Sequence, residues 1–136
     1  MKKDFKSWHN NKTQIQEDKT RPFFHEREVW FISLGLNIGF EQDGKGIEFK
    51  RPVIIFKKFN NECFWGIPLT KNPKKGKYYF NFELESRGPN TAIISQLRLL
   101  DSKRLQYKIG HVSEAQIKEI KQKLKSLISW VLSINP

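Results

Sequence analysis

Short segments rich in β-branched and aromatic residues recur through the middle of this chain, and turn residues separate them. The clearest is YFNFEL at residues 79–84, where an apolar side chain at every second position indicates a strand with one buried face. Strand-like composition also marks residues 29–34, 53–57, 63–69 and 91–99. Because most of the connections are short, we expect these five strands to form one small, mostly antiparallel sheet.

The C-terminal part of the sequence has the pattern of one amphipathic helix. Ser113 and Gln116 have the spacing of a capping box, in which each side chain satisfies a backbone amide at the helix start. An apolar stripe follows at three- and four-residue steps, formed by Ile117, Ile120, Leu124, Leu127, Ile128 and Val131. The predicted fold is therefore mainly β with a C-terminal α-helix, in the form of a small SH3-like curled antiparallel barrel.

The N-terminal stretch differs in texture from the rest of the chain. It is polar, with isolated apolar residues at Phe5, Trp8 and Ile15, so both a short helix and a disordered arm fit it. Pro22 disfavours helix in the residue before it and makes a natural boundary. We predict a basic N-terminal extension over residues 1–24 and one compact domain over residues 25–136.

Cysteine usage and hydropathy both favour the cytoplasm. Cys63 is the single cysteine, so an intrachain disulfide is excluded, and a lone thiol in an apolar run fits a reducing compartment. The first residues form no hydrophobic signal stretch, and no apolar run approaches the length of a membrane span. We expect a soluble cytoplasmic protein with no membrane partner.

The chain is strongly basic, with 25 Lys and Arg against 14 Asp and Glu and a net charge of +11. The excess is spread along the chain, since residues 1–24 carry 6 basic and 3 acidic residues, residues 25–100 carry 12 and 8, and residues 101–136 carry 7 and 3. Such a balance favours a polyanionic partner, nucleic acid first, because neutralised phosphates release counterions. Charge alone does not distinguish a surface that binds such a partner from a basic surface that is simply solvated.

Several classes of enzyme site are missing from the sequence. Cys63, His9, His25 and His111 are scattered, without the spacing of metal ligands, and neither a nucleophile elbow nor a GxxxxGKS phosphate loop occurs. An arginine can grip a phosphate through two parallel hydrogen bonds, and a nearby hydroxyl can help it to stabilise a five-coordinate transition state. Polar residues that suit such a site occur near predicted strand ends, at Glu41, Gln42, Arg51, Thr70, Ser95, Gln96 and Arg98.

Taken singly, these residues have simpler explanations. Arg51 fits a surface salt bridge with Glu48 or Glu41, and Thr70 fits an ordinary turn. Their order along the chain is more informative than any one of them. A G-x-E-Q element, an R-P-V strand start, a P-L-T strand end and a Q-x-R-x-x-D-x-x-R-L stretch follow one another between residues 39 and 105.

In this order the elements resemble the MazF/PemK (Kid) family of type II toxin–antitoxin ribonucleases, over about residues 27–125. The resemblance implies a CcdB/PemK-like curled sheet with a C-terminal helix. It also implies a homodimeric toxin that cuts single-stranded RNA without a metal or another cofactor, and that a cognate acidic antitoxin blocks. In this chemistry the ribose 2′-hydroxyl attacks the phosphate and leaves a 2′,3′-cyclic phosphate and a 5′-hydroxyl.

By motif, the resemblance gives Arg51 and Thr70 catalytic roles and makes Glu41 the acid of the loop between the first two strands. We expect RNA contacts from Gln42, Lys50, Lys71, Lys74, Lys75, Ser95, Gln96 and Arg98. The chain departs from the family in three places. Phe40 stands where some relatives have histidine, Ile93 and Ser95 stand where some have arginine and aspartate, and residues 43–50 lengthen the loop. Glu41 is then the one nearby carboxylate that can accept the proton.

Two other functions fit the same fold. The related CcdB-type toxins poison DNA gyrase and cut nothing, and a catalytically silent SH3-like domain could bind RNA through charge alone. The pairing of Arg51 with Thr70 favours the nuclease, because neither alternative needs it. The sequence does not predict which bases flank the cut, since loops determine that choice.

Overall fold

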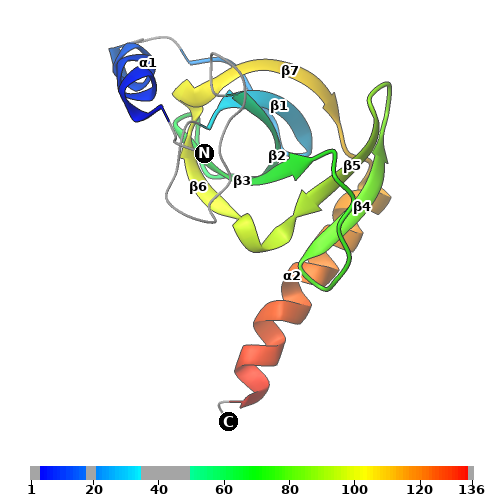
Figure 1. The fold of residues 1–136 in the computed structure, drawn as a ribbon. Coiled ribbons are helices and arrows are strands. Elements are labelled where there is room, and N and C mark those ends of the chain that lie inside the picture. Colours follow the sequence, from blue (N-terminus) through cyan, green and yellow to red (C-terminus); the bar gives the residue numbers. More distant parts are fainter. Residues whose placement is uncertain (1–3, 18–20, 35–49, 135–136) are drawn as a thin grey trace.

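The computed structural model describes residues 4–17, 21–34 and 50–134, and forms a curled, mainly antiparallel β half-barrel with a helix near each end of the chain (Figure 1). The helices are α1 (Phe5–Glu17) and α2 (Glu114–Ile134). The strands are β1 (Glu28–Ser33), β2 (Lys50–Lys58), β3 (Cys63–Thr70), β4 (Tyr79–Leu84), β5 (Gly88–Ile93), β6 (Arg98–Asp101) and β7 (Leu105–His111). Two short 3-10 turns, η1 (Ile94–Gln96) and η2 (Ser102–Arg104), lie on either side of β6. Within the described ranges, neither helix combines the length and the apolar character needed to cross a bilayer.

The predicted mainly β fold is confirmed, but the prediction of five strands is wrong. The segment 91–99 is not one strand: β5 ends at Ile93, η1 turns the chain, and β6 begins at Arg98. Both strands pair with β3, β5 at Leu69 and Thr70 and β6 from Cys63 to Gly66. The chain must therefore step along a single edge of β3, and the turn at η1 makes this step. The seventh strand, β7, pairs with β1 and was not predicted.

The central strands are buried on both faces because two hydrophobic clusters lie on opposite sides of them. One cluster lies inside the curl and includes Val53 and Ile55 of β2 and Phe64 of β3. The other lies between the sheet and α2 and includes Ile54 of β2 and Ile67 of β3. This alternation explains why these two strands read as continuous apolar runs, whereas β4 alternates between buried and exposed residues as predicted.

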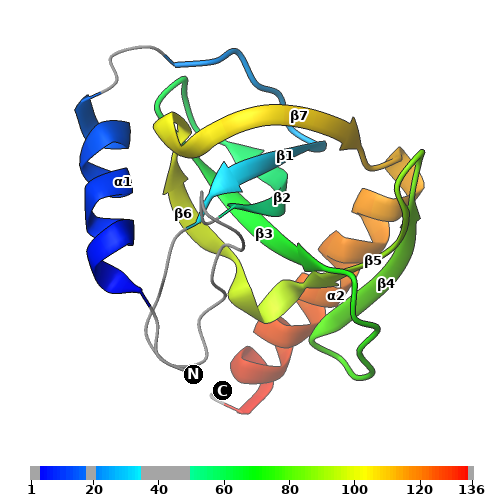
Figure 2. The same ribbon diagram turned by 45° about the horizontal axis from the view of Figure 1, so that its top comes forward.

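The N-terminal extension forms a helix that packs on the turn between β6 and β7 (Figure 2). Asp4 caps its start by accepting a hydrogen bond from the Ser7 amide at 3.0 Å. Trp8 is buried, and the Arg104 guanidinium lies 5.8 Å from the centre of its ring. Beyond the helix, Arg21 donates to the Asp101 carboxylate at 2.6 Å. Of the two possibilities for this stretch, the helix is therefore the one observed.

Helix α2 begins with the predicted capping box. The Ser113 amide donates to Gln116 Oε1 at 2.9 Å, and the Gln116 amide donates to Ser113 Oγ at 3.1 Å. The first half of the apolar stripe packs on the sheet, whereas Ile128 is 55% exposed. The side chain of Val131 lies outside the described residues. Figures 1 and 2 show the second half of the helix continuing past the edge of the sheet.

The tight contact around Gly66 yields a stability prediction. An added Cβ would meet Val53 Cγ1 at 2.6 Å and Leu100 Cδ1 at 2.8 Å, inside the curl. We expect Gly66→Ala to lower the free energy of unfolding by about 1–3 kcal/mol, as overpacked cores do. Gly110→Ala is the matched control, because its nearest neighbour, Leu84 Cδ1, lies at an ordinary 3.7 Å. Equal midpoints for the two variants in chemical denaturation would contradict this account.

Candidate active site

Arg51 and Thr70 lie side by side because β2 and β3 are antiparallel. Their register pairs Val53 with Pro68, and two further residues along the same register bring Arg51 opposite Thr70. A hydrogen bond joins the two strand ends here, since Arg51 Nη1 donates to the Leu69 carbonyl at 3.0 Å. On the other side of β2, Arg51 pairs with Ile32 of β1. The start of β2 and the end of β3 therefore form one edge of the half-barrel.

The simpler explanation of Arg51, as a residue in a surface salt bridge, does not hold. The strand already begins at Lys50, and Arg51 is only 7% exposed between its two neighbouring strands. Arg51, Val53 and Ile55 lie at every second position of β2, so their side chains share the face that lines the curl. A guanidinium this deep depends on hydrogen bonds such as the one to Leu69.

A hollow of about 250 Å³ opens beside this pair. Apolar walls come from Phe31, Pro52 and Leu69, and polar groups come from Lys50, Arg51, Thr70, Lys71, Asn72 and Asn90. Its described lining contains three cationic side chains, and no carboxylate or imidazole is among them. The electrostatics therefore suit an anion.

The Thr70 hydroxyl already has one hydrogen bond. Its oxygen accepts from the Asn72 amide at 3.3 Å, which is the bond that a turn threonine makes. This bond occupies a lone pair of the oxygen, so the hydroxyl proton can still be donated. The geometry is thus compatible both with a turn residue and with a group that touches a phosphate.

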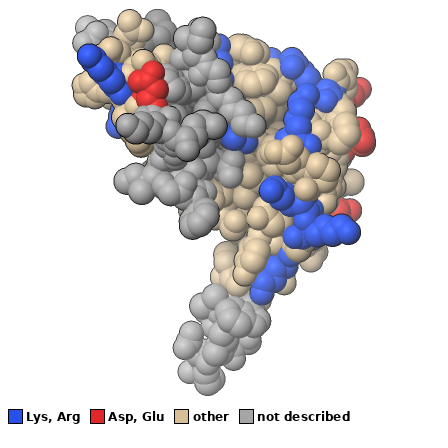
Figure 3. Space-filling view, viewed as in Figure 1, with Lys and Arg blue, Asp and Glu red and all other residues tan. Residues whose placement is uncertain are grey.

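Aromatic and basic side chains surround the hollow. Tyr107 of β7 is exposed, and its ring centre lies 5.2 Å from that of Phe31 and 5.2 Å from Lys50 Nζ. Lys71 lines the hollow, whereas Lys74 and Lys75 lie farther along the same exposed loop between β3 and β4. Basic side chains predominate on the face seen in Figure 3, where a group of them lies over β4 and the loop before it.

Ser95, Gln96 and Arg98 are not brought into this hollow. Ser95 and Gln96 lie on η1, and Arg98 pairs with Gly66, four residues and about 13 Å before Thr70 along β3. Glu41 and Gln42 fall outside the described residues. The structure thus brings Lys50, Arg51, Thr70 and Lys71 together in one hollow. Ser95, Gln96 and Arg98 lie outside it.

Two residues outside the predicted site, Asn90 and Arg104, are also held in place by the fold. Asn90 lies within β5, opposite Phe82, and is 4% exposed. Arg104 donates to the Ser33 carbonyl at 2.9 Å, and burial together with the neighbouring Arg98 lowers the pKa of its guanidinium. Arg104 is the last arginine of the Q-x-R-x-x-D-x-x-R-L stretch, whereas only the pairing of strands places Asn90, which no local signal in the sequence identifies.

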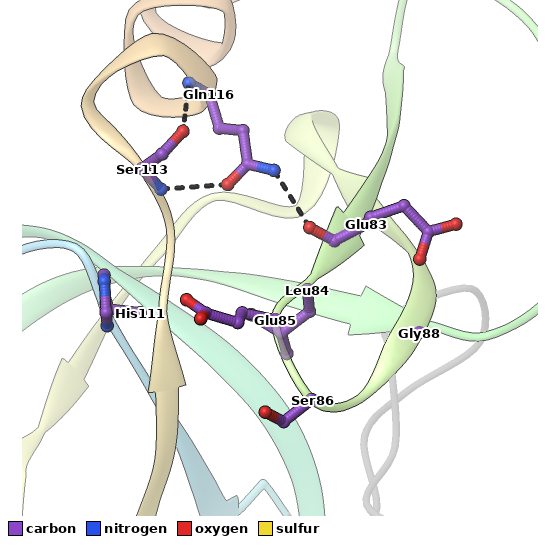
Figure 4. Close-up of a pocket in the computed structure, with 8 residues that line it drawn as sticks. All are labelled: Glu83, Leu84, Glu85, Ser86, Gly88, His111, Ser113 and Gln116. Atoms are coloured by element: carbon purple, nitrogen blue, oxygen red, sulfur yellow. Dashed lines mark hydrogen bonds between the residues drawn. The ribbon is translucent and has the colours of Figure 1, made fainter.

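A second hollow, of about 390 Å³, has the opposite character (Figure 4). It lies where the turn between β4 and β5 meets the start of α2, and Gln116 Nε2 donates to the Glu83 carbonyl across it at 2.9 Å. Glu83, Glu85 and His111 line it. Its acidic lining does not suit a phosphate. In the described part of the chain, no three His, Cys, Asp or Glu side chains form a group that could hold a metal ion.

Comparison with known proteins agrees with this architecture. A family model described as a PemK-like, MazF-like toxin of a type II toxin–antitoxin system matches residues 26–128. A search of curated protein sequences finds no significant match.

Solved structures match as well, at low sequence identity. The crystal structure of MazF from Deinococcus radiodurans is 17% identical, with a TM-score of 0.67 over 82% of this chain and 99% of that one. The MazE–MazF structure from the same organism is 16% identical, with a TM-score of 0.59 over 81% and 97%. An endoribonuclease from a mycobacterial species, in complex with its cognate antitoxin, is 12% identical, with a TM-score of 0.60 over 79% and 96%. At these identities the likeness shows the fold.

Proposed function

Because the chain belongs to the PemK-like, MazF-like toxin family of type II toxin–antitoxin systems, we propose that it is a toxin that cleaves single-stranded RNA at selected sequences. The observation that supports this most is the position of Arg51 beside Thr70, at the edge of a hollow whose described charged residues are all cationic. A protein that only binds gyrase has no need of this arrangement.

In the proposed reaction, the ribose 2′-oxygen attacks the adjacent phosphorus and the bond from phosphorus to the 5′-oxygen breaks. The products are a 2′,3′-cyclic phosphate and a 5′-hydroxyl, and no water is consumed. Arg51 donates hydrogen bonds to the nonbridging oxygens, where negative charge grows in the five-coordinate transition state. Thr70 donates its hydroxyl proton to the same group. The 2′-hydroxyl proton passes to Glu41 in this proposal, and the leaving oxygen takes a proton from solvent.

The proposed partners follow from the charge and the shape of the chain. A net charge of +11 attracts both RNA and an acidic antitoxin segment that folds over the same surface. One similar solved structure is an endoribonuclease in complex with its cognate antitoxin, and another is MazE–MazF. A homodimer is proposed because apolar surface remains uncovered, namely Trp65 and its cross-strand neighbour Leu99 on the sheet, and Ile128 on α2.

The first prediction from the proposed function concerns metal dependence. We expect purified protein to cut a long single-stranded RNA in excess EDTA and to leave cyclic phosphate ends, since a guanidinium and a hydroxyl supply the charge stabilisation. Gel analysis of the RNA and of its 3′ ends measures both features. Loss of cutting in EDTA, with recovery on adding magnesium or zinc, would rule out this mechanism.

The second prediction concerns the shape of the cation. Arg51→Lys keeps the charge but loses the planar two-point grip, so we expect cleavage to fall about 100- to 1000-fold. The variant should also lose about 1–3 kcal/mol of unfolding free energy, because the Leu69 carbonyl loses its donor. Rates are therefore compared at a temperature where both proteins are folded. Arg87→Lys, in the exposed turn between β4 and β5, is the control and should cut normally.

The third prediction tests the hydroxyl of Thr70 with little change of shape. We expect Thr70→Val to lower turnover while binding of a non-cleavable 2′-deoxy substrate stays within a few-fold of the original. Thr13→Val, in α1, controls for the substitution itself. Equal turnover by Thr70→Val and the parent protein would assign Thr70 to the turn alone.

The fourth prediction concerns assembly. Light scattering should give twice the 16.2 kDa mass of one chain at micromolar concentration. Ile128→Asp should shift the protein toward the single-chain mass, because it places a charge in the proposed contact. Glu119→Lys, on the opposite side of the helix, should leave the mass unchanged. An active protein with the mass of one chain would rule out the homodimer as the form that cuts RNA.

A further inference from the structure

Asn90 is a buried amide that the proposed cleavage chemistry does not use. Asn90 is 4% exposed. It lies on the strand next to that of Thr70, because Thr70 pairs with Thr91, the residue that follows Asn90. Within residues 4–17, 21–34 and 50–134, its side chain makes one hydrogen bond, from Nδ2 to the Gly88 carbonyl at 3.2 Å. That bond leaves the Oδ1 acceptor and a second N–H without a partner in this part of the chain. Although the residue as a whole is only 4% exposed, its Oδ1 is not sealed from solvent, so it is open to a ligand in the hollow.

The surroundings of Asn90 indicate what completes its hydrogen bonds. Asn90 and Lys71 line both the hollow beside Arg51 and an adjoining hollow of about 270 Å³ along β4 and β5. The two hollows therefore meet at these two side chains. Phe31, Pro52 and Leu69 form apolar walls of the hollow beside Arg51, and the Asn90 amide adds polar atoms to its lining.

A flat apolar ring with a polar edge matches this space. A nucleobase has two apolar faces and an edge that carries donors and acceptors, and in single-stranded RNA this edge is open to reading. Asparagine pairs with such an edge by donating one hydrogen bond and accepting another, most often with the N6 and N7 positions of adenine. Lys50 and Lys71 lie at the same hollow and suit the flanking phosphates.

We propose that the hollow beside Arg51 is a nucleobase subsite, and that Asn90 reads the edge of the base next to the scissile phosphate. This inference rests on the proposed function, because it concerns the RNA that the same site cuts. It makes Asn90 a specificity-determining residue with no part in bond breaking. Changing Asn90 should therefore alter which base is preferred next to the cut while RNA cleavage itself continues.

The test maps cut sites on one long RNA by sequencing the fragment ends. We expect the parent protein to prefer one base at a position next to the cut, and Asn90→Ala to lose that preference by about tenfold to a hundredfold. Total cutting of other sequences should stay within a few-fold. Asn61→Ala, in the exposed turn between β2 and β3, is the matched control and should keep the preference.

A second measurement needs no variant, in case Asn90→Ala does not fold. Synthetic RNAs carry, at the preferred position, a base analogue that lacks one donor or acceptor on its edge. The parent protein should cut them about tenfold to a hundredfold more slowly, and Asn90→Ala should treat analogue and normal base alike. An unchanged preference in folded Asn90→Ala, or no base preference in the parent, overturns the subsite while cleavage stands. Absence of all cleavage by the parent protein overturns the proposed function and the subsite with it.

Discussion

The pairing of β3 with three other strands is the constraint on which the rest of this structure depends. Its first half pairs with β6, its end pairs with β5, and its other edge pairs with β2. The residue that ends β3 is Thr70, so one threonine meets the start of β2 on one side and β5 on the other. Shifting this register by one residue would turn Thr70 to the other face and bury different side chains. The hollow beside Arg51 therefore exists only because the whole sheet is in register.

A buried guanidinium at this junction has a cost and a use. Removing a charge from water is unfavourable, and the hydrogen bond to the Leu69 carbonyl offsets only part of that cost. The same burial holds the arginine still, between β1 and β3. A cation that is already in place needs no reorganisation when charge develops on a phosphate, which is why preorganised donors are effective. The hydrogen bond that stabilises the buried side chain thus also holds it ready for a phosphate.

The sequence predicted well those features that depend on short-range pattern. The alternation of residues 79–84, the capping box of Ser113 and Gln116, and the P-L-T end of a strand are local, and each appears where expected. The errors concern pairing between distant segments. Arg51 is buried because β1 and β3 flank it, and Asn90 is buried because it lies opposite Phe82 on β4. Neither fact can be read from neighbours in the sequence.

The electrostatics of the hollow bear on one step of the proposed cleavage, the removal of the 2′-proton. Lys50, Arg51 and Lys71 line the same space, and nearby positive charge stabilises anions. Such a field keeps a carboxylate ionised at neutral pH but also makes it a weaker base. It lowers the pKa of the attacking hydroxyl in the same direction, so the two effects on proton transfer partly cancel. A cationic site can therefore work with an ordinary carboxylate, placed at its edge, and needs no group with a strongly raised pKa.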